Sequence, residues 1–120
     1  MTDNIHNYGY RAPRYCADFH LLLQVLNPSP MILDAHCTSL SEDGLAAEVN
    51  ASLEIGTNLT IIMTLPGSPR SLRVSARVTN LQADGYGFAF VFGDDEMKRY
   101  LRNYLESNSS SMVRSPYSTD

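Results

Sequence analysis

The sequence predicts an all-β domain with one C-terminal helix, built as a six-stranded antiparallel β-barrel. Three observations lead to this prediction. Six segments alternate apolar and polar residues with a period of two, turn-forming residues separate most of them, and the last periodic segment changes to helical spacing. A length of 120 residues and a hydrophobic content of 43% fit one folded domain, so wholesale disorder is excluded.

Alternation defines one apolar face in each of the six predicted strands. The clearest case is residues 71–79, where Leu, Val and Ala alternate with Ser, Arg and Thr. Such a period of two indicates a strand with one buried face. The predicted inward-facing residues are Phe19, Leu21, Leu23, Val25, Met31, Leu33, Ala35, Cys37, Leu45, Ala47, Val49, Leu59, Ile61, Met63, Leu65, Leu72, Val74, Ala76, Val78, Tyr86, Phe88, Phe90 and Phe92.

Turn-forming residues stand between the predicted strands. These separators are Asn27-Pro28-Ser29-Pro30, Gly56-Thr57-Asn58, Pro66-Gly67-Ser68-Pro69 and Ala83-Asp84-Gly85. Because the connections are brief and contain no helix, we predict an antiparallel meander. One apolar face per strand has to be buried, and closure of the sheet into a barrel also removes its exposed edges.

A single helix is predicted over residues 94–106. Asp94 is the candidate N-cap, and Asp95 and Glu96 bring negative charge to the first turn, where the helix dipole favours it. The apolar stripe of this helix consists of Met97, Tyr100, Leu101, Tyr104 and Leu105, and three cations occupy its other faces, Lys98, Arg99 and Arg102. We expect the stripe to lie over an open end or a seam of the sheet.

The two ends of the chain differ from the middle in composition. Residues 1–14 are largely polar and contain two arginines, and we predict a flexible N-terminal arm there. Residues 107–120 are rich in serine and hold few apolar groups, so we predict a disordered tail. The barrel and its helix are then predicted over residues 15–106.

Charge and composition exclude several classes of partner. Nine Lys and Arg residues against thirteen Asp and Glu residues give a net charge of -4, so we expect no binding to DNA or RNA. No apolar run approaches the ~18–20 residues that cross a bilayer, and the first residues lack the regions of a signal peptide. Two cysteines form neither a disulfide framework nor a zinc-binding spacing. We predict a cytoplasmic domain without membrane insertion.

Residues able to support catalysis or bind a metal form no convincing site. Cys37 falls on the apolar face of its predicted strand and Cys16 in no periodic segment, so neither is predicted to be a nucleophile. If strands 19–26 and 31–38 form a hairpin, His20 lies opposite His36 on the outer surface. Two imidazoles supply half of a zinc site, but no third ligand is evident, and solvated histidines are the favoured interpretation. We predict no enzyme activity, no cofactor and no metal.

Two polar segments remain as candidates for binding a ligand. Tyr10-Arg11-Ala12-Pro13-Arg14-Tyr15 lies directly before the first strand and holds the only Lys or Arg residues among the first 69 positions. Paired guanidinium groups suit an anionic planar ligand, because they donate to phosphate or to the O6/N7 edge of guanine; plain surface charge is the alternative. Thr38-Ser39-Leu40-Ser41-Glu42-Asp43-Gly44-Leu45 is predicted to connect two strands and to present backbone N–H groups to a ligand. The alternative is an ordinary turn in which Gly44 supplies a positive φ.

In their order and spacing these segments resemble the PilZ domain family. The resemblance covers roughly residues 10–106 and includes the Tyr-Gly-Phe-Ala-Phe strand and the terminal helix. It implies a six-stranded antiparallel β-barrel and binding of the bacterial second messenger cyclic di-GMP through RxxxR and [D/N]xSxxG motifs. Arg14 fills the second arginine of RxxxR, whereas Tyr10 stands at the first and Arg11 follows one residue later. The resemblance implies that both arginines bind phosphates and guanine edges, and Tyr10 is a candidate to stack on a base.

In the second motif, Ser41 and Gly44 match the Ser and Gly, and Ser39 stands where the family has Asp or Asn. The resemblance implies that these three residues line the loop opposite the arginines. We therefore predict a cyclic di-GMP receptor that passes its signal, as an adaptor, to an unidentified protein effector. The alternative is a degenerate PilZ module that does not bind cyclic di-GMP and acts by protein–protein contacts.

Overall fold

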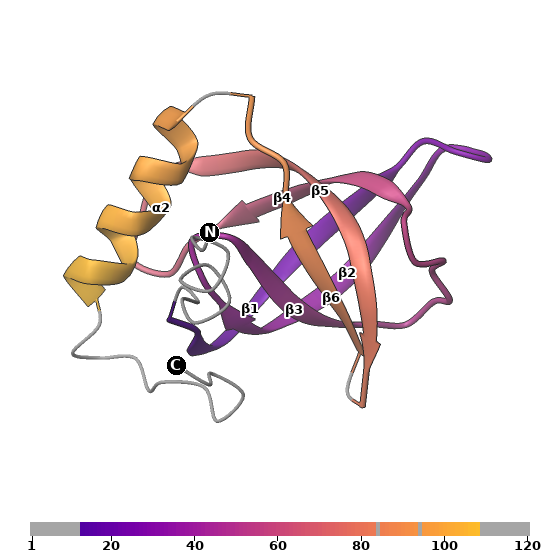
Figure 1. The fold of residues 1–120 in the computed structure, drawn as a ribbon, viewed down its shortest axis with the longest axis horizontal. Coiled ribbons are helices and arrows are strands. Elements are labelled where there is room, and N and C mark those ends of the chain that lie inside the picture. Colours follow the sequence, from indigo (N-terminus) through magenta and orange to yellow (C-terminus); the bar gives the residue numbers. More distant parts are fainter. Residues whose placement is uncertain (1–12, 84, 94, 109–120) are drawn as a thin grey trace, which may run out of the picture.

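The computed structural model describes residues 13–83, 85–93 and 95–108, which form six strands and one helix (Figure 1). The elements are β1 (Tyr15–Val25), β2 (Met31–Leu40), β3 (Gly44–Val49), β4 (Asn58–Thr64), β5 (Ser71–Gln82), β6 (Gly85–Phe90) and α2 (Asp95–Asn108). Most of the predicted N-terminal arm and C-terminal tail, residues 1–12 and 109–120, lies outside the described residues.

The six strands form a closed barrel in the order β1-β2-β3-β6-β5-β4, and every neighbouring pair is antiparallel. This confirms the predicted six-stranded antiparallel barrel. The predicted meander is wrong, because β3 pairs with β6 and β4 closes the barrel against β1. Alternation fixes which face of a strand is buried, but it does not fix which strand lies beside it. The link over residues 50–57 carries the chain from β3 to β4 on the opposite side of the barrel.

Irregularities in the ladders explain where strand boundaries differ from the prediction. The β1–β2 register shifts between Cys16 and Phe19, and β1 begins at residue 15 rather than at 19. The β5–β6 register shifts between Val78 and Asn80, and β5 continues to residue 82 rather than ending at 79. A bulge inserts an extra residue and so interrupts the alternation. A pattern with a strict period of two therefore stops at the bulge although the strand continues.

The predicted apolar faces fill the barrel. Met31 is the one predicted inward residue that is exposed, at 41%, because it lies beside the turn that joins β1 to β2. The other predicted inward residues are buried or pack against the core in part. The fully buried large side chains are Leu21, Leu23, Val25, Leu40, Leu45, Ile61, Met63, Leu65, Leu72, Val78, Phe88 and Leu101.

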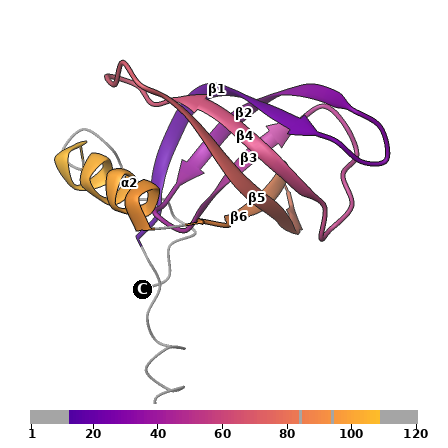
Figure 2. The same ribbon diagram turned by 90° about the horizontal axis from the view of Figure 1, so that it is seen from above.

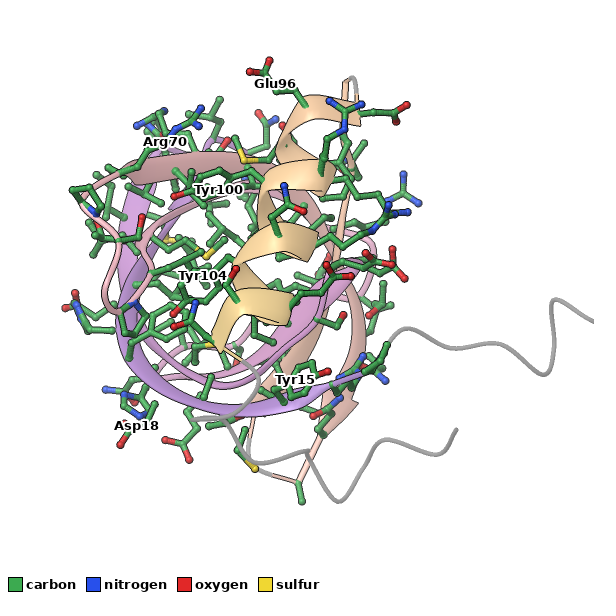
Figure 3. All side chains as sticks on the ribbon, turned by 90° about the vertical axis from the view of Figure 1, so that its left-hand side faces the viewer. Tyr15, Asp18, Arg70, Glu96, Tyr100 and Tyr104 are labelled. Carbon is green, nitrogen blue, oxygen red and sulfur yellow. The ribbon has the colours of Figure 1, made fainter. Side chains whose placement is uncertain are left out.

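Helix α2 lies across one open end of the barrel (Figures 1 and 3), as its apolar stripe predicts. Leu101 and Leu105 belong to the barrel core. The helix ends at Asn108 rather than at 106, and the side chain of Asn108 donates to the backbone carbonyl of Tyr104. Its predicted N-cap, Asp94, lies outside the described residues. Within the described part of the chain, no helix has the length and apolar character that crossing a membrane requires.

Two tyrosines attach α2 to the loop between β4 and β5 (Figure 3). Tyr104 donates its hydroxyl to the carbonyl of Pro66 at 2.7 Å, and the Tyr100 hydroxyl lies 2.7 Å from Oγ of Ser68. The guanidinium of Arg70 lies 4.9 Å from the centre of the Tyr100 ring, a cation–π contact. Partial burial raises the pKa of Tyr104, and the neighbouring Tyr100 raises it further by a smaller amount. The Tyr104 hydroxyl therefore stays protonated at neutral pH and can donate its hydrogen bond.

We expect Leu101→Ala to lower the free energy of unfolding by about 2–5 kcal/mol, because it opens a cavity where the helix meets the barrel. Denaturant unfolding followed by circular dichroism measures this change. Asn103→Ala, on the exposed face of the same helix, is the matched control and should cost much less. Equal costs for the two variants would mean that α2 does not close the core.

Candidate ligand-binding site

A tight turn over residues 41–43 joins β2 to β3, and Ser41 closes it from inside. Its Oγ accepts hydrogen bonds from the backbone N–H groups of Asp43 at 3.1 Å and Gly44 at 3.2 Å. Its own N–H donates to the carbonyl of Gly44 at 2.8 Å. Serine is common in such turns because its short side chain lets the hydroxyl accept hydrogen bonds from nearby backbone N–H groups. Ser41 is 3% exposed, so this hydroxyl belongs to the interior of the turn.

Gly44 begins β3 at a point where two backbones come close together. It pairs with Ala89 of β6, and a Cβ at position 44 would overlap the carbonyl oxygen of Phe88. Gly44 does not have a positive φ, so the predicted alternative of a left-handed glycine is wrong. The residue is glycine because β6 leaves no room for a side chain.

Ser39 belongs to strand β2 rather than to the predicted loop between two strands. It pairs with Cys16 on β1 and with Ala46 on β3, and it is 5% exposed. The β2–β3 register shifts around Thr38, so the inward alternation is broken and both Ser39 and Leu40 are buried. This bulge hid the last residues of β2 from the period-two pattern.

Arg14 lies directly before β1, at the same end of the β1–β2 ladder as Ser41. Tyr15 pairs with Leu40 and Cys16 pairs with Ser39, so the position before Tyr15 adjoins the β2–β3 turn. The structure therefore brings together one predicted arginine and the predicted serine segment. Arg14 is half-buried there. Tyr10 and Arg11 lie outside the described residues.

Two ion pairs that were not predicted from the sequence connect this turn to α2. Arg102 Nε lies 2.7 Å from Glu42 Oε1, and Lys98 Nζ lies 3.2 Å from Asp43 Oδ1. Lys98 and Arg102 are four residues apart and so share one face of the helix. That spacing was visible in the sequence, but the acidic partners were not, because 60 residues separate Glu42 from Arg102.

The predicted opposition of His20 and His36 is confirmed by the β1–β2 register. Nε2 of His20 lies 3.1 Å from Asp34 Oδ1, and Nε2 of His36 lies 2.6 Å from Asp18 Oδ1, so each imidazole has its own carboxylate. Within residues 13–83, 85–93 and 95–108, no three His, Cys, Asp or Glu side chains form a group able to hold a metal ion.

Cys37 is a core residue, as its predicted face indicates, and is fully buried. Burial raises the pKa of its thiol to about 12, and a smaller opposing effect of the Ser39 backbone lowers it. The thiol is therefore protonated at neutral pH and is a poor nucleophile. Cys16 is exposed, and neither cysteine forms a disulfide.

The sequence matches the family model described as the PilZ domain over residues 11–107, and the chain belongs to this family. No curated protein sequence gives a significant match. The fold is similar to that of the PilZ domain of CeSA from a cellulose-synthesizing bacterium, with a TM-score of 0.63 and 18% identity. That match covers 80% of this chain and 97% of the CeSA chain.

Two further solved structures share the fold. The PilZ domain of YcgR from Escherichia coli, determined with c-di-GMP, has a TM-score of 0.67 at 14% identity, over 86% of this chain and 93% of the other. The Bacillus subtilis inhibitor of motility, MotI/DgrA, has a TM-score of 0.66 at 14% identity, over 85% of this chain and 52% of the other. At these identities the likeness establishes the barrel and its helix.

Gly44→Ala should lower the free energy of unfolding by about 3 kcal/mol or more, because a methyl group meets the Phe88 carbonyl and β3 has to move away from β6. Gly93→Ala is the matched control, since a Cβ at position 93 meets nothing within 4 Å. Thermal and denaturant unfolding measure both variants. If Gly44→Ala is as stable as Gly93→Ala, the close approach of the two strands is not a constraint.

Proposed function

We propose that this PilZ domain is a cytoplasmic receptor for cyclic di-GMP that passes the signal to a partner protein without catalysing a reaction. Family membership supports this proposal, as does the related YcgR domain, whose structure was determined with c-di-GMP. Two unpaired cysteines fit a reducing compartment. The observation that carries the proposal is the β1–β2 register, through which Arg14 adjoins the segment of Ser39 and Ser41.

The proposed recognition uses guanidinium groups on one side and the β2–β3 segment on the other. Arg14, together with Arg11, would donate to the phosphates and to the guanine edges, which suit the planar fork of arginine. Ser39 would offer its hydroxyl where the family has Asp or Asn, and Tyr10 would stack on a base. In this proposal Ser41 and Gly44 contribute through the shape of the turn. The Ser41 hydroxyl closes the turn by hydrogen bonds, and the lack of a side chain at Gly44 lets β6 lie close to β3.

The ion pairs with α2 favour an anionic ligand at this end of the barrel. Glu42 and Asp43 would otherwise repel a phosphate that approaches the turn. Lys98 and Arg102 offset these two charges, and both cations remain partly exposed, at 36% and 51% of their side chains. A dianionic ligand beside Arg14 then meets a turn whose acids are already paired.

We propose that binding transmits the signal through residues 1–14. This segment carries both proposed ligand-binding arginines, and a ligand that holds them against the barrel also holds the segment in one position. The charge-assisted hydrogen bonds offset the conformational entropy that is lost. A partner protein would then recognise the new surface, and the ligand would act by shifting the population toward it.

The second candidate function is a PilZ module that acts by protein contacts alone. Two observations favour it. Tyr10 and Ser39 depart from the family motifs, and Ser39 and Ser41 are 5% and 3% exposed. The Ser41 hydroxyl is already used within the turn, so Ser41 has a structural role that needs no ligand. Titration with cyclic di-GMP separates the two functions.

Isothermal titration of the full chain with cyclic di-GMP should show saturable binding. A charge-assisted hydrogen bond is worth about 1.5–3 kcal/mol, so Ser39 should make binding about ten to a hundred times weaker than in a domain with Asp there. Arg14→Ala should abolish the heat of binding. Arg77→Ala, which removes an exposed arginine from the outer face of β5, is the matched control and should bind as the wild type does. No saturation with high micromolar ligand would favour the second candidate function.

Ser39→Asp should strengthen binding by about ten to a hundred times, because it restores the charged acceptor for a guanine N–H. Ser39→Asn is its neutral counterpart and should give a smaller gain. A carboxylate at a position that is 5% exposed also loses hydration, so thermal unfolding of the free protein should show a lower Tm for Ser39→Asp. If Ser39→Asn binds more strongly and Ser39→Asp binds more weakly than the wild type, position 39 faces the phosphates, because a carboxylate there repels them. Unchanged affinity in both Ser39→Asp and Arg14→Ala would show that the ligand binds elsewhere.

A further inference from the structure

Part of the barrel wall is apolar on its outer side. Outward positions of an antiparallel barrel are ordinarily polar, and here three strands depart from that rule. Leu22 stands between the inward residues of β1, Ile62 between those of β4, and Ile32 opposes Gln24 on the outer side of β2. Ile32 is 61% exposed, while Leu22 and Ile62 are half-buried. These strands are neighbours, so the three side chains form one patch.

The patch lies within a cross-strand row that runs from an acid to a base. Leu22 pairs with Asp34 on one side and with Ile62 on the other, and Ile62 pairs with Arg73. The row therefore reads Asp34, Leu22, Ile62, Arg73 across β2, β1, β4 and β5; Figure 2 shows β4 and β5 side by side in this wall. We call these four residues the outer row.

The charged ends of the outer row are too far apart to pair within one molecule. Three strand spacings separate their backbones, about 14 Å. Asp34 is 81% exposed in its side chain and accepts its hydrogen bond from His20, at 3.1 Å. Arg73 is exposed and donates to Oε1 of Gln24 at 2.8 Å. Both charges therefore remain accessible to another molecule.

We propose that the outer row is a self-association surface on which a second copy of the chain packs face to face. A two-fold axis that runs between β1 and β4, parallel to the strands, reverses the order of the row. Asp34 of each copy then meets Arg73 of the other, and Leu22 meets Ile62. Such an isologous contact needs a surface that is its own complement, and a row with opposite charges at its ends and apolar residues in its centre meets that requirement.

The same operation matches the residues beside the outer row. The next row reads Ile32, Gln24, Thr60 and Ser75 across the same strands. Rotation brings Gln24 of one copy to Thr60 of the other, so an amide faces a hydroxyl, and it covers Ile32. No like charges meet in either row. This complementarity identifies the occupant as a second copy of this chain.

Sedimentation velocity of the full chain, without nucleotide, tests the proposal. The wild type should show a monomer–dimer equilibrium over a concentration series from micromolar to millimolar. Asp34→Arg gives two cations at the ends of the row and Arg73→Asp gives two acids, so each variant alone should dimerise at least about tenfold more weakly. An equimolar mixture of the two should regain the dimer, because both contacts across the axis are then between opposite charges.

Matched controls carry the same charge changes outside the row. Glu54→Arg and Arg77→Asp alter exposed residues of the link before β4 and of β5, and both should dimerise as the wild type does. Circular dichroism of each variant checks the fold. A wild type that stays monomeric throughout the series overturns the proposal. The proposal is also overturned if Asp34→Arg or Arg73→Asp alone dimerises as strongly as the wild type. It is overturned as well if the mixture of the two variants stays monomeric.

Discussion

The ladder between β1 and β4 closes the barrel, and both the buried core and the position of the candidate site follow from this closure. Residues 21–24 of β1 pair with residues 60–63 of β4, and without this ladder both strands would present unpaired edges. Closure also encloses the apolar faces, so that α2 covers a core at one open end (Figure 3). The start of β1 is thereby held at that end, beside the turn that follows β2.

The β2–β3 turn is held from inside and from outside, with unequal strength. Each buried hydrogen bond of Ser41 is worth about 0.5–1.5 kcal/mol net, and each ion pair with α2, being partly exposed, about 0–1 kcal/mol. The backbone of β6 also lies so close to Gly44 that any other residue at this position would force the two strands apart. The turn therefore keeps its shape through Ser41 and Gly44, and the ion pairs mainly arrange charge around it.

The β1–β2 ladder has two different surfaces, one on each side of its register shift between Cys16 and Phe19. At the end near α2, the pairing of Cys16 with Ser39 aligns Arg14 with the turn. Farther along the same ladder, the pairing of Leu22 with Asp34 starts the outer row that continues onto β4 and β5. A slip of one residue in either part of the ladder would exchange its inward and outward faces and would destroy the arrangement there.

Local periodicity was enough to predict which faces of the strands are buried, how many strands there are and which residues form the helix. The opposition of His20 and His36 was also predictable, since the position of the hairpin turn and the parity of its faces together fix that pairing. The pairing of β3 with β6 could not be predicted in this way, since it joins distant segments and depends on how the whole core packs. For the same reason the role of Gly44 came from the structure: a carbonyl of β6, far along the chain, occupies the space that a side chain would need.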